Sequence, residues 1–315
     1  MKLAVIFPGQ GAQYPGMGET LYKNHSEARE LFSTADAALG YGLTNLMFSG
    51  SAEELQMTEH TQPAILTHSI AAWTVLQSYL PSESVKAAAG LSLGEYSGLV
   101  SAGVLGFTDA LHVVRERGIA MQNAVPPGAG AMAAVLGLAE APLVEVVDHI
   151  SSLYGVLEVA NYNSPGQIVI SGLKEAVAAA QDPLKAAGAS RIIPLQVSAP
   201  FHCALLEPAA VKLADILTGV SVSQFMFKVI ANVSGDFYPG VAEVKDLLVR
   251  QVINAVRWDQ GVRRLLAEGF DTFIELGPGT TLSQFVRRIA KDVGVQVKLA
   301  SLDCWDDLER VMGIL

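Results

Sequence analysis

The alternation of strand and helix patterns constrains the fold of this chain more than any other feature. An apolar run over residues 1–7 predicts a buried strand that ends at a Pro-Gly turn, and a second strand over residues 85–91 leads into a helix over residues 95–102. Because parallel strands need a long and usually helical crossover, this order predicts a mostly parallel sheet covered by helices. The same patterns predict helices over residues 26–39, 61–80, 109–123, 244–255, 259–268 and 281–290, and strands over residues 228–233, 272–276 and 296–299.

A separate unit is predicted after the Pro- and Gly-rich linker at residues 125–130. Its elements follow the order β-α-β-β-α-β, which is the ferredoxin-like arrangement. The strands are expected over residues 131–138, 157–161, 167–171 and 191–197, and the helices over residues 141–153 and 175–187. Because the first pattern resumes afterwards, we expect residues 128–197 to be an insertion that divides one larger domain into residues 1–127 and 198–315.

Length, composition and charge exclude several classes of protein. With 315 residues, of which 50% are apolar and 17% charged, the chain can bury a large core and is neither disordered nor fibrous. The 21 basic side chains are outnumbered by 31 acidic ones, and the net charge is −10. Nucleic acid and anionic membrane surfaces are therefore not expected as partners.

The sequence predicts neither export nor membrane insertion. The uncharged stretches at residues 60–82 and 118–139 carry too many polar, proline and glycine residues to span a bilayer, and the first apolar run is too short for a secretory signal. Cys203 and Cys304 are too few for a disulfide framework and lack the spacing of a zinc site. We therefore expect a cytoplasmic protein.

A Gly-x-Ser-x-Gly motif at residues 90–94 is the first candidate for chemistry. It lies between a predicted strand and a predicted helix, the setting of a nucleophile elbow, where small neighbours allow a sharp turn that projects the Ser92 hydroxyl. The start of the next helix would offer backbone N–H groups to a developing negative charge. The same motif also occurs by chance in plain structural turns, so both interpretations stand at this point.

Ser92 needs a general base, and His202 is the favoured histidine. It follows the non-periodic turn at residues 198–201, where a loop side chain can face a cleft between domains, whereas the other five histidines lie in or beside predicted helices. A triad acid would lie between serine and histidine in chain order, but the aspartates there lie in or beside predicted helices, and Glu95 lies in the helix of the elbow itself. A serine–histidine pair oriented by a neutral acceptor is therefore favoured over a hydrolase triad.

Other motifs allow two interpretations each. The Gly277-Pro278-Gly279 segment could bind an anion or form a plain turn, and Asn161-Tyr162-Asn163 could hold a ligand or simply turn the chain. Arg115 and Arg117 lie on one predicted helix, and the pattern does not separate either from a solvated face. The sequence motifs of phosphate loops, dinucleotide sites and zinc proteases are absent, so no metal or redox cofactor is expected.

Six separated motifs together resemble the malonyl-CoA:acyl carrier protein transacylase family, nearly from end to end. In the family's order they are Pro8-Gly9-Gln10-Gly11-Ala12-Gln13, Thr61-Gln62-Pro63-Ala64, Gly90-Leu91-Ser92-Leu93-Gly94-Glu95-Tyr96, Arg117-Gly118, Pro200-Phe201-His202 and Glu275-Leu276-Gly277-Pro278-Gly279. The resemblance implies an α/β-hydrolase-like large domain with a parallel sheet and an inserted ferredoxin-like (βαββαβ) subdomain. One departure is Leu91, where the family usually has histidine.

The resemblance also implies roles for individual residues. It makes Ser92 the nucleophile and His202 its general base. The other matches orient the base or bind substrate: Gln251 beside the histidine, the backbone N–H groups of Gln10 and Leu93 for the oxyanion, Arg117 for the malonyl carboxylate, and Asn161 and Asn163 at the edge of the cleft.

The implied reaction moves a malonyl group from malonyl-CoA to the phosphopantetheine thiol of acyl carrier protein through a malonyl-serine, supplies fatty acid synthesis and needs no cofactor. The implied partners are acyl carrier protein and a coenzyme A thioester, without nucleic acid or membrane, and a monomer is expected. Three alternatives stand beside it: a discrete acyltransferase of a polyketide synthase, an acyl hydrolase of the same fold, and a scaffold that binds carrier protein without turnover. Arg117 argues against the hydrolase, because simple acyl groups have no carboxylate for it to bind.

Overall fold

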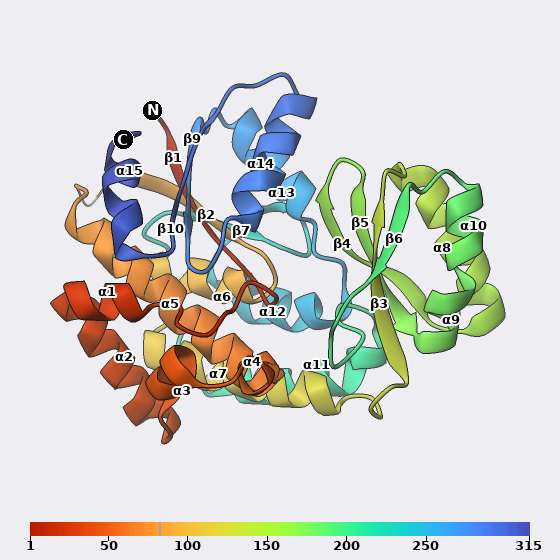
Figure 1. The fold of residues 1–315 in the computed structure, drawn as a ribbon, viewed down its shortest axis with the longest axis horizontal. Helices are drawn as coiled ribbons and strands as arrows, with labels where there is room; N and C mark the ends of the chain where they lie inside the picture. Colours follow the sequence, from red (N-terminus) through yellow and green to blue (C-terminus); the bar gives the residue numbers. More distant parts are fainter. Residues whose placement is uncertain (82) are drawn as a thin grey trace.

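Two β-sheets organise the protein, whose computed structural model describes residues 1–81 and 83–315 (Figure 1). The larger sheet has the strand order β10-β9-β1-β2-β7-β8, and the smaller has the order β4-β5-β3-β6. Pairings from β10 to β7 are parallel, whereas β8 and all pairings of the small sheet are antiparallel. Residue 82, the last of the uncharged stretch 60–82, lies outside the described residues.

Helices flank the large sheet on both faces and divide its side chains between two cores (Figure 1). The strands are β1 (Leu3–Phe7), β2 (Val85–Gly90), β7 (Lys228–Ala231), β8 (Asp236–Phe237), β9 (Thr272–Leu276) and β10 (Lys298–Leu302). The helices are α1 (Glu19–Asn24), α2 (Ser26–Leu39), α3 (Leu43–Ser49), α4 (Ala52–Gln56), α5 (Thr58–Ser78), α6 (Leu93–Ser101), α7 (Phe107–Asn123), α11 (Glu207–Thr218), α12 (Val244–Ile253), α13 (Trp258–Ala267), α14 (Thr281–Asp292) and α15 (Leu308–Met312). Along β1, Leu3, Val5 and Phe7 join the core with α2, α5 and α7, while Ala4 and Ile6 join the core with α13 and α14.

The small sheet belongs to the inserted unit. Its elements are β3 (Gly130–Leu136), α8 (Glu140–Tyr154), β4 (Leu157–Ser164), β5 (Gln167–Leu173), α9 (Lys174–Ala179), α10 (Gln181–Ala186) and β6 (Arg191–Pro194). Val135 of β3 packs with the unit's own helices, whereas Met132 belongs to the core of the large unit. The second face of this sheet therefore meets the large unit. At the β4 edge of the sheet, the Tyr162 backbone N–H donates to the Val256 carbonyl at 2.9 Å.

The predicted fold class is confirmed, with differences in detail. The helix predicted over residues 175–187 is two helices, because the ring of Pro183 would clash with a helical carbonyl four residues earlier, at Ala179, where α9 ends. The strand predicted over residues 296–299 is β10, whose position is set by its parallel pairing with β9. The pattern predicts no helix where α11 lies, although Pro208 in its first turn is a frequent helix start.

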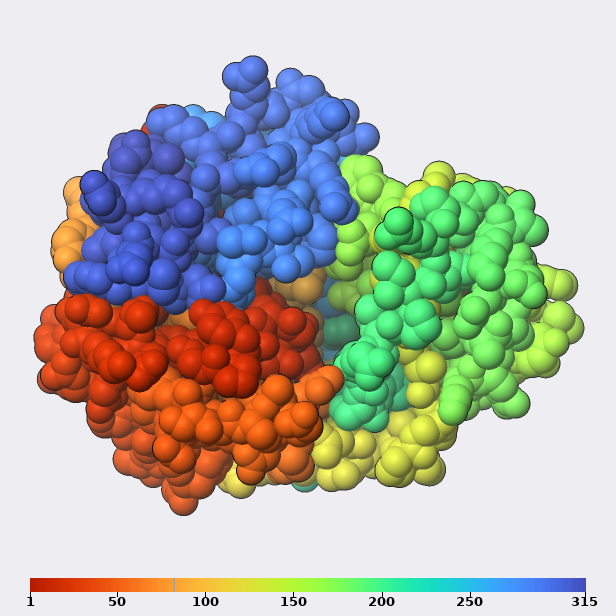
Figure 2. Space-filling view, in the orientation of Figure 1, coloured from red at the N-terminus to blue at the C-terminus, as the bar shows by residue number. Residues whose placement is uncertain are grey.

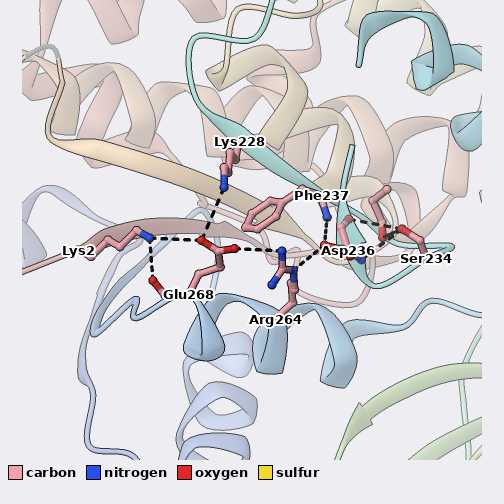
Figure 3. A network of polar contacts seen from close by, with 8 residues as sticks. Lys2, Lys228, Ser234, Asp236, Phe237, Arg264 and Glu268 are labelled. Carbon is pink, nitrogen blue, oxygen red and sulfur yellow. Dashed lines mark hydrogen bonds and ion pairs between the residues drawn. The ribbon is translucent and has the colours of Figure 1, made fainter. Parts of the chain in front are cut away.

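An ion-pair network joins the amino end of the large sheet to α13 (Figure 3). The Glu268 carboxylate lies 3.7 Å from both the Lys2 and Lys228 ammonium groups and 3.0 Å from the Arg264 guanidinium, which also reaches Asp236 at 2.8 Å. These side chains are partly exposed, so each pair stabilises the fold by about 1 kcal/mol or less. The network links the amino ends of β1 and β7 to Asp236 of β8, which pairs with Ala231 at the carboxyl end of β7.

No helix in the described part of the chain is long and apolar enough to cross a membrane.

Candidate active site

A tight turn between β2 and α6 presents Ser92 at the carboxyl end of the parallel strands. A Cβ atom at Gly90 would lie 1.9 Å from the carbonyl of Gly94, and one at Gly94 would lie 2.1 Å from the carbonyl oxygen of Phe7. Both glycines are therefore required by the close approach of three backbone segments. The turn has the geometry that the Gly-x-Ser-x-Gly motif predicts for a nucleophile elbow.

Ser92 and His202 form a hydrogen-bonded pair. The Ser92 Oγ lies 2.8 Å from His202 Nε2. Among the described residues, these two are the non-glycine residues with positive φ, 52° for Ser92 and 60° for His202. Side chains rarely occupy this region, and such strain is typically retained at functional sites. The structure thus brings together the two residues that the sequence favours as nucleophile and base.

The histidine is held as an acceptor toward the serine hydroxyl. Its Nδ1 lies 2.8 Å from the backbone carbonyl oxygen of Gln251, which can only accept, so Nδ1 carries the proton and Nε2 is free to take one from Ser92. Burial, and then the positive charge of Arg117, lower the pKa of His202 to about 4. The ring is therefore neutral at pH 7, as a general base must be.

Gln251 is next to the histidine, as the resemblance implies, but its backbone rather than its side chain contacts the ring. The side-chain Nε2 donates to the Ser92 carbonyl oxygen at 2.9 Å and to the Glu95 carboxylate at 2.7 Å. Its Oε1 accepts from Arg117 at 2.8 Å. Gln251 therefore contacts three residues of the site: the backbone of Ser92, the ring of His202 and the guanidinium of Arg117.

Arg117 is a buried cation whose guanidinium lies beside the nucleophile. Only 1% of the residue is exposed. One terminal nitrogen donates to Gln62 at 2.9 Å, and the other donates to Gln251 at 2.8 Å and to the Ser92 Oγ at 3.1 Å. No carboxylate in residues 1–81 and 83–315 forms an ion pair with it. Arg115 instead lies over the ring of Tyr41, so the structure distinguishes two arginines that the sequence pattern does not.

Two backbone N–H groups are free to bind an oxyanion beside Ser92. Those of Gln10 and Leu93 have no acceptor in the described part of the chain. The loop that carries Gln10 runs close to the elbow, since a Cβ atom at Gly9 would lie 2.4 Å from the carbonyl oxygen of Leu91. Pairs of this kind stabilise the negative oxygen of a tetrahedral intermediate.

Asn232 and Glu95 support the elbow from behind. Asn232 was not among the sequence candidates, and Glu95 was considered there only as a triad acid, a role for which it was not favoured. The Asn232 side chain accepts from the Ser92 N–H at 2.7 Å and donates to the Gly90 carbonyl at 2.7 Å, which fixes both ends of the turn. Its backbone N–H donates to the Glu95 carboxylate at 3.2 Å. Asn232 directly follows β7, so a polar residue at the carboxyl end of a predicted strand was the signal available in the sequence.

The site opens into a cavity of about 160 Å³ between the two units. Ser92, His202 and Arg117 line it from the large unit, and Asn161 and Asn163 line it from β4 of the small unit. The two asparagines are separated by one residue of β4, and both reach the same cavity although the pairing with β5 shifts register between Tyr162 and Ser164. In space-filling view the surface is hollowed between the two units (Figure 2), and a wider hollow of about 900 Å³ shares Gln10 with the inner cavity.

No metal site accompanies this arrangement, because residues 1–81 and 83–315 contain no group of three or more His, Cys, Asp or Glu side chains placed to hold an ion.

Sequence comparison connects this site to a known family. Residues 5–302 match the model of the acyl transferase domain family. The malonyl CoA-acyl carrier protein transacylase of Bacillus subtilis (strain 168) is 46% identical over 289 residues, which cover 91% of this chain and 90% of the relative. The malonyl CoA-acyl carrier protein transacylase of Escherichia coli (strain K12) is 44% identical over 288 residues, covering 91% and 93%.

Solved structures agree with these matches over the whole chain. An acyl carrier protein S-malonyltransferase from Vibrio cholerae O1 is 40% identical and superposes with a TM-score of 0.94, covering 99% of this chain and 100% of that one. A malonyl-transacylase in complex with its type II PKS acyl-carrier protein is 39% identical, with a TM-score of 0.95 and 100% of both chains covered. The chain therefore belongs to the acyl transferase family, among the malonyl CoA-acyl carrier protein transacylases.

Proposed function

We propose that this enzyme transfers the malonyl group of malonyl-CoA to the phosphopantetheine thiol of acyl carrier protein, and that Ser92 carries the group between the two steps. The proposal rests on the buried Arg117 guanidinium, which has no ion-pair partner among the described residues. It lies 3.1 Å from the hydroxyl of a serine that is hydrogen-bonded to a neutral histidine. The relatives, which are malonyl CoA-acyl carrier protein transacylases, support the same reaction.

The first step forms an ester on Ser92. As the Ser92 Oγ attacks the thioester carbonyl carbon, its proton passes to His202 Nε2, and the backbone N–H groups of Gln10 and Leu93 bind the oxygen that becomes negative. The carbon–sulfur bond then breaks, and the departing thiolate of coenzyme A takes the proton from His202. The Gln251 carbonyl stabilises the imidazolium that exists between these events, because it accepts from Nδ1.

The second step repeats the chemistry with a new nucleophile. The phosphopantetheine thiol gives its proton to His202 and attacks the malonyl ester, and the Ser92 oxygen leaves with that proton. The structure neighbour solved with a carrier protein supports carrier protein as the acceptor. No resident cofactor takes part in this scheme, since every proton and bond is accounted for by the two substrates and the chain.

Arg117 also supports a preference for malonyl over neutral acyl groups. A malonyl carboxylate would form a charge-assisted pair with the guanidinium, whereas an acetyl group would leave a buried cation without a partner. Sites built for a polar group reject analogues that lack it by up to roughly 10⁴-fold. Asn161 and Asn163 add polar groups on the opposite wall, and the Asn163 Oδ1 is buried without a partner among the described residues.

We test the proposal by intact-mass measurement of the purified enzyme after brief mixing with malonyl-CoA or with acetyl-CoA. We expect a malonyl adduct on Ser92 that moves to phosphopantetheinylated carrier protein when the carrier is added. Carriers from fatty acid and polyketide synthesis, compared in the same assay, decide which pathway the enzyme supplies. Loss of the adduct to water would support a hydrolase, and no adduct from either thioester would support a scaffold.

We also propose that the enzyme acts as a cytoplasmic monomer. Both substrates are soluble, and all catalytic groups named above come from one chain. Light scattering after size exclusion should give the mass of one chain, and a mass of two chains would contradict this part of the proposal.

A further inference from the structure

Glu95 has a fully buried carboxylate behind the nucleophile. Its backbone N–H donates to the Ser92 carbonyl oxygen at 3.1 Å, whereas its carboxylate makes no hydrogen bond to Ser92. The residue is 0% exposed, one turn into the helix that Ser92 precedes, and it does not line the active-site cavity. Its carboxylate accepts from the side-chain amide of Gln251 at 2.7 Å, from the backbone N–H of Asn232 at 3.2 Å and from the hydroxyl of Tyr238. It forms no ion pair within the described residues.

A buried carboxylate without an ion-pair partner is costly, and packing alone does not require one here. Burial raises the pKa of Glu95 to about 7 against the opposing effect of its hydrogen bonds. Two of its three donors belong to residues that hold the site: Asn232 binds the Ser92 N–H, and Gln251 binds the Ser92 carbonyl, His202 and Arg117. Two of the three contacts of Glu95 therefore lead to residues that hold the site, and the third comes from Tyr238 of the surrounding core.

The Glu95 carboxylate and the Ser92 carbonyl oxygen both accept from the Gln251 amide nitrogen, at 2.7 and 2.9 Å, and together fix which way that amide faces. A carboxylate accepts hydrogen bonds, so the amide nitrogen of Gln251 must face Glu95 and the amide oxygen must face away from it. That oxygen is the acceptor for the Arg117 terminal nitrogen that also lies 3.1 Å from the Ser92 Oγ. If the Gln251 amide rotated by half a turn, its N–H groups would face the guanidinium. The Arg117 nitrogen that lies near Ser92 would then lose Gln251 as an acceptor.

We propose that Glu95 is a positioning residue for malonyl transfer, which acts through the Gln251 amide to hold the Arg117 guanidinium where the substrate carboxylate arrives. This inference rests on the proposed function. It assigns Glu95 an effect on malonyl recognition that exceeds its effect on acyl transfer in general, because an acetyl group makes no use of the guanidinium. Tyr238 belongs to the same arrangement as the donor that holds the second oxygen of the carboxylate.

The test compares Glu95→Gln with Glu275→Gln, which changes a second buried carboxylate that binds the start of α14 and does not line the cavity. Initial rates of adduct formation from malonyl-CoA and acetyl-CoA give kcat/KM for each, and thermal unfolding gives the stability of each variant. For Glu95→Gln we expect the malonyl-to-acetyl ratio to fall about tenfold, mainly through the malonyl KM, as for a lost hydrogen bond in a charged network. For Glu275→Gln we expect a lower Tm and a ratio within about twofold of the wild type.

Tyr238→Phe supplies a graded second variant, because it removes one donor from Glu95 and leaves Gln251 in place. We expect the same direction with a smaller fall in the ratio, about threefold. If Glu95→Gln does not fold, the malonyl-to-acetyl ratio of Tyr238→Phe tests the inference on its own. A folded Glu95→Gln with the wild-type ratio would overturn the inference, as would an equal fall in Glu275→Gln. If the wild-type enzyme itself formed no malonyl adduct, the proposed function would fail first, so the two failures are distinguishable.

Discussion

Two glycine-rich turns lie at the carboxyl ends of strands that flank β1, and the protein uses them differently. The turn after β2 carries Ser92 at φ 52°, whereas the turn after β9 has glycine, Gly277 and Gly279, at its two positive φ values. Glycine enters this region freely and serine does not. A positive φ at a residue other than glycine therefore identifies the functional turn better than the presence of glycines does.

The two turns also differ in what binds the N–H groups at the start of the following helix. At the start of α14 the Glu275 carboxylate accepts from the N–H groups of Leu282 and Ser283 at 3.0 and 2.7 Å, and Asp303 accepts from Gly279 at 3.0 Å. The protein's own carboxylates occupy this helix start, which favours a plain turn over an anion site. The Leu93 N–H at the start of α6 has no acceptor in the described chain, and Leu93 lines the cavity together with the Arg117 cation.

The strongest way to break this comparison is to remove the hydroxyl from the first turn. We expect Ser92→Ala to form no malonyl adduct and to lower the transfer rate by about 10⁵-fold or more, because loss of a nucleophile removes the covalent path. Thr280→Ala is the matched control in the second turn, since Thr280 is exposed before α14, and it should transfer malonyl at the wild-type rate. An adduct on Ser92→Ala would assign the nucleophile to another residue.

The next largest effect concerns the cation that accompanies only the first turn. We expect Arg117→Ala to lower kcat/KM for malonyl-CoA by about 10³-fold and to change that for acetyl-CoA by less than about tenfold, because only malonyl has a carboxylate to pair. Adduct formation from both thioesters, followed by intact mass, measures the two values. Unchanged malonyl selectivity would show that another group recognises the carboxylate.

The sequence predicts the first turn well because its constraints are local. All the signals for this turn lie within a few residues of Ser92: the glycines two positions before and after it, the preceding strand and the following helix. The family motifs support His202 as its partner. The supporting groups are contributed by distant segments, and their roles depend on tertiary geometry. Arg115 and Arg117 differ by about half a helical turn, and only packing decides which one is buried.

Gln251 shows the same limit at the level of single atoms. The resemblance places it beside the histidine, but the contact with the ring is a backbone carbonyl, which any residue type would supply. Its side chain is needed for a different reason, the joint hydrogen bonding of Ser92, Glu95 and Arg117. Residue identity therefore predicts that Gln251 lies in the site. It does not predict which contacts its backbone makes and which its side chain makes.

The pH dependence of the rate sharpens the comparison, because Ser92 of the first turn is hydrogen-bonded to a histidine that acts as its base, and the second turn has no role in the reaction. Since the pKa of His202 is lowered to about 4, the base is neutral above that value. We expect the rate of malonyl adduct formation to be nearly constant between pH 5 and pH 7 as far as His202 is concerned, and to fall about tenfold per pH unit below about pH 4. A rate that already fell below pH 6.5 would mean that the imidazole is not depressed.

The smallest expected effect is on stability and belongs to the second turn. Burial raises the pKa of Glu275 to about 7, above the ordinary value of 4.5, so the folded state prefers the protonated group. Its contribution to the free energy of unfolding is therefore complete below about pH 4.5 and is lost as the pH rises through about 7. We expect Glu275→Gln to lose about 1 kcal/mol at pH 5, because the amide nitrogen cannot accept a hydrogen bond whereas the hydroxyl oxygen of the protonated carboxyl group can, and to lie closer to the wild type at pH 7.5. Denaturant unfolding at the two pH values measures the gap, and a gap that widened with pH, or a loss of malonyl transfer by the folded variant, would contradict a purely structural role for this turn.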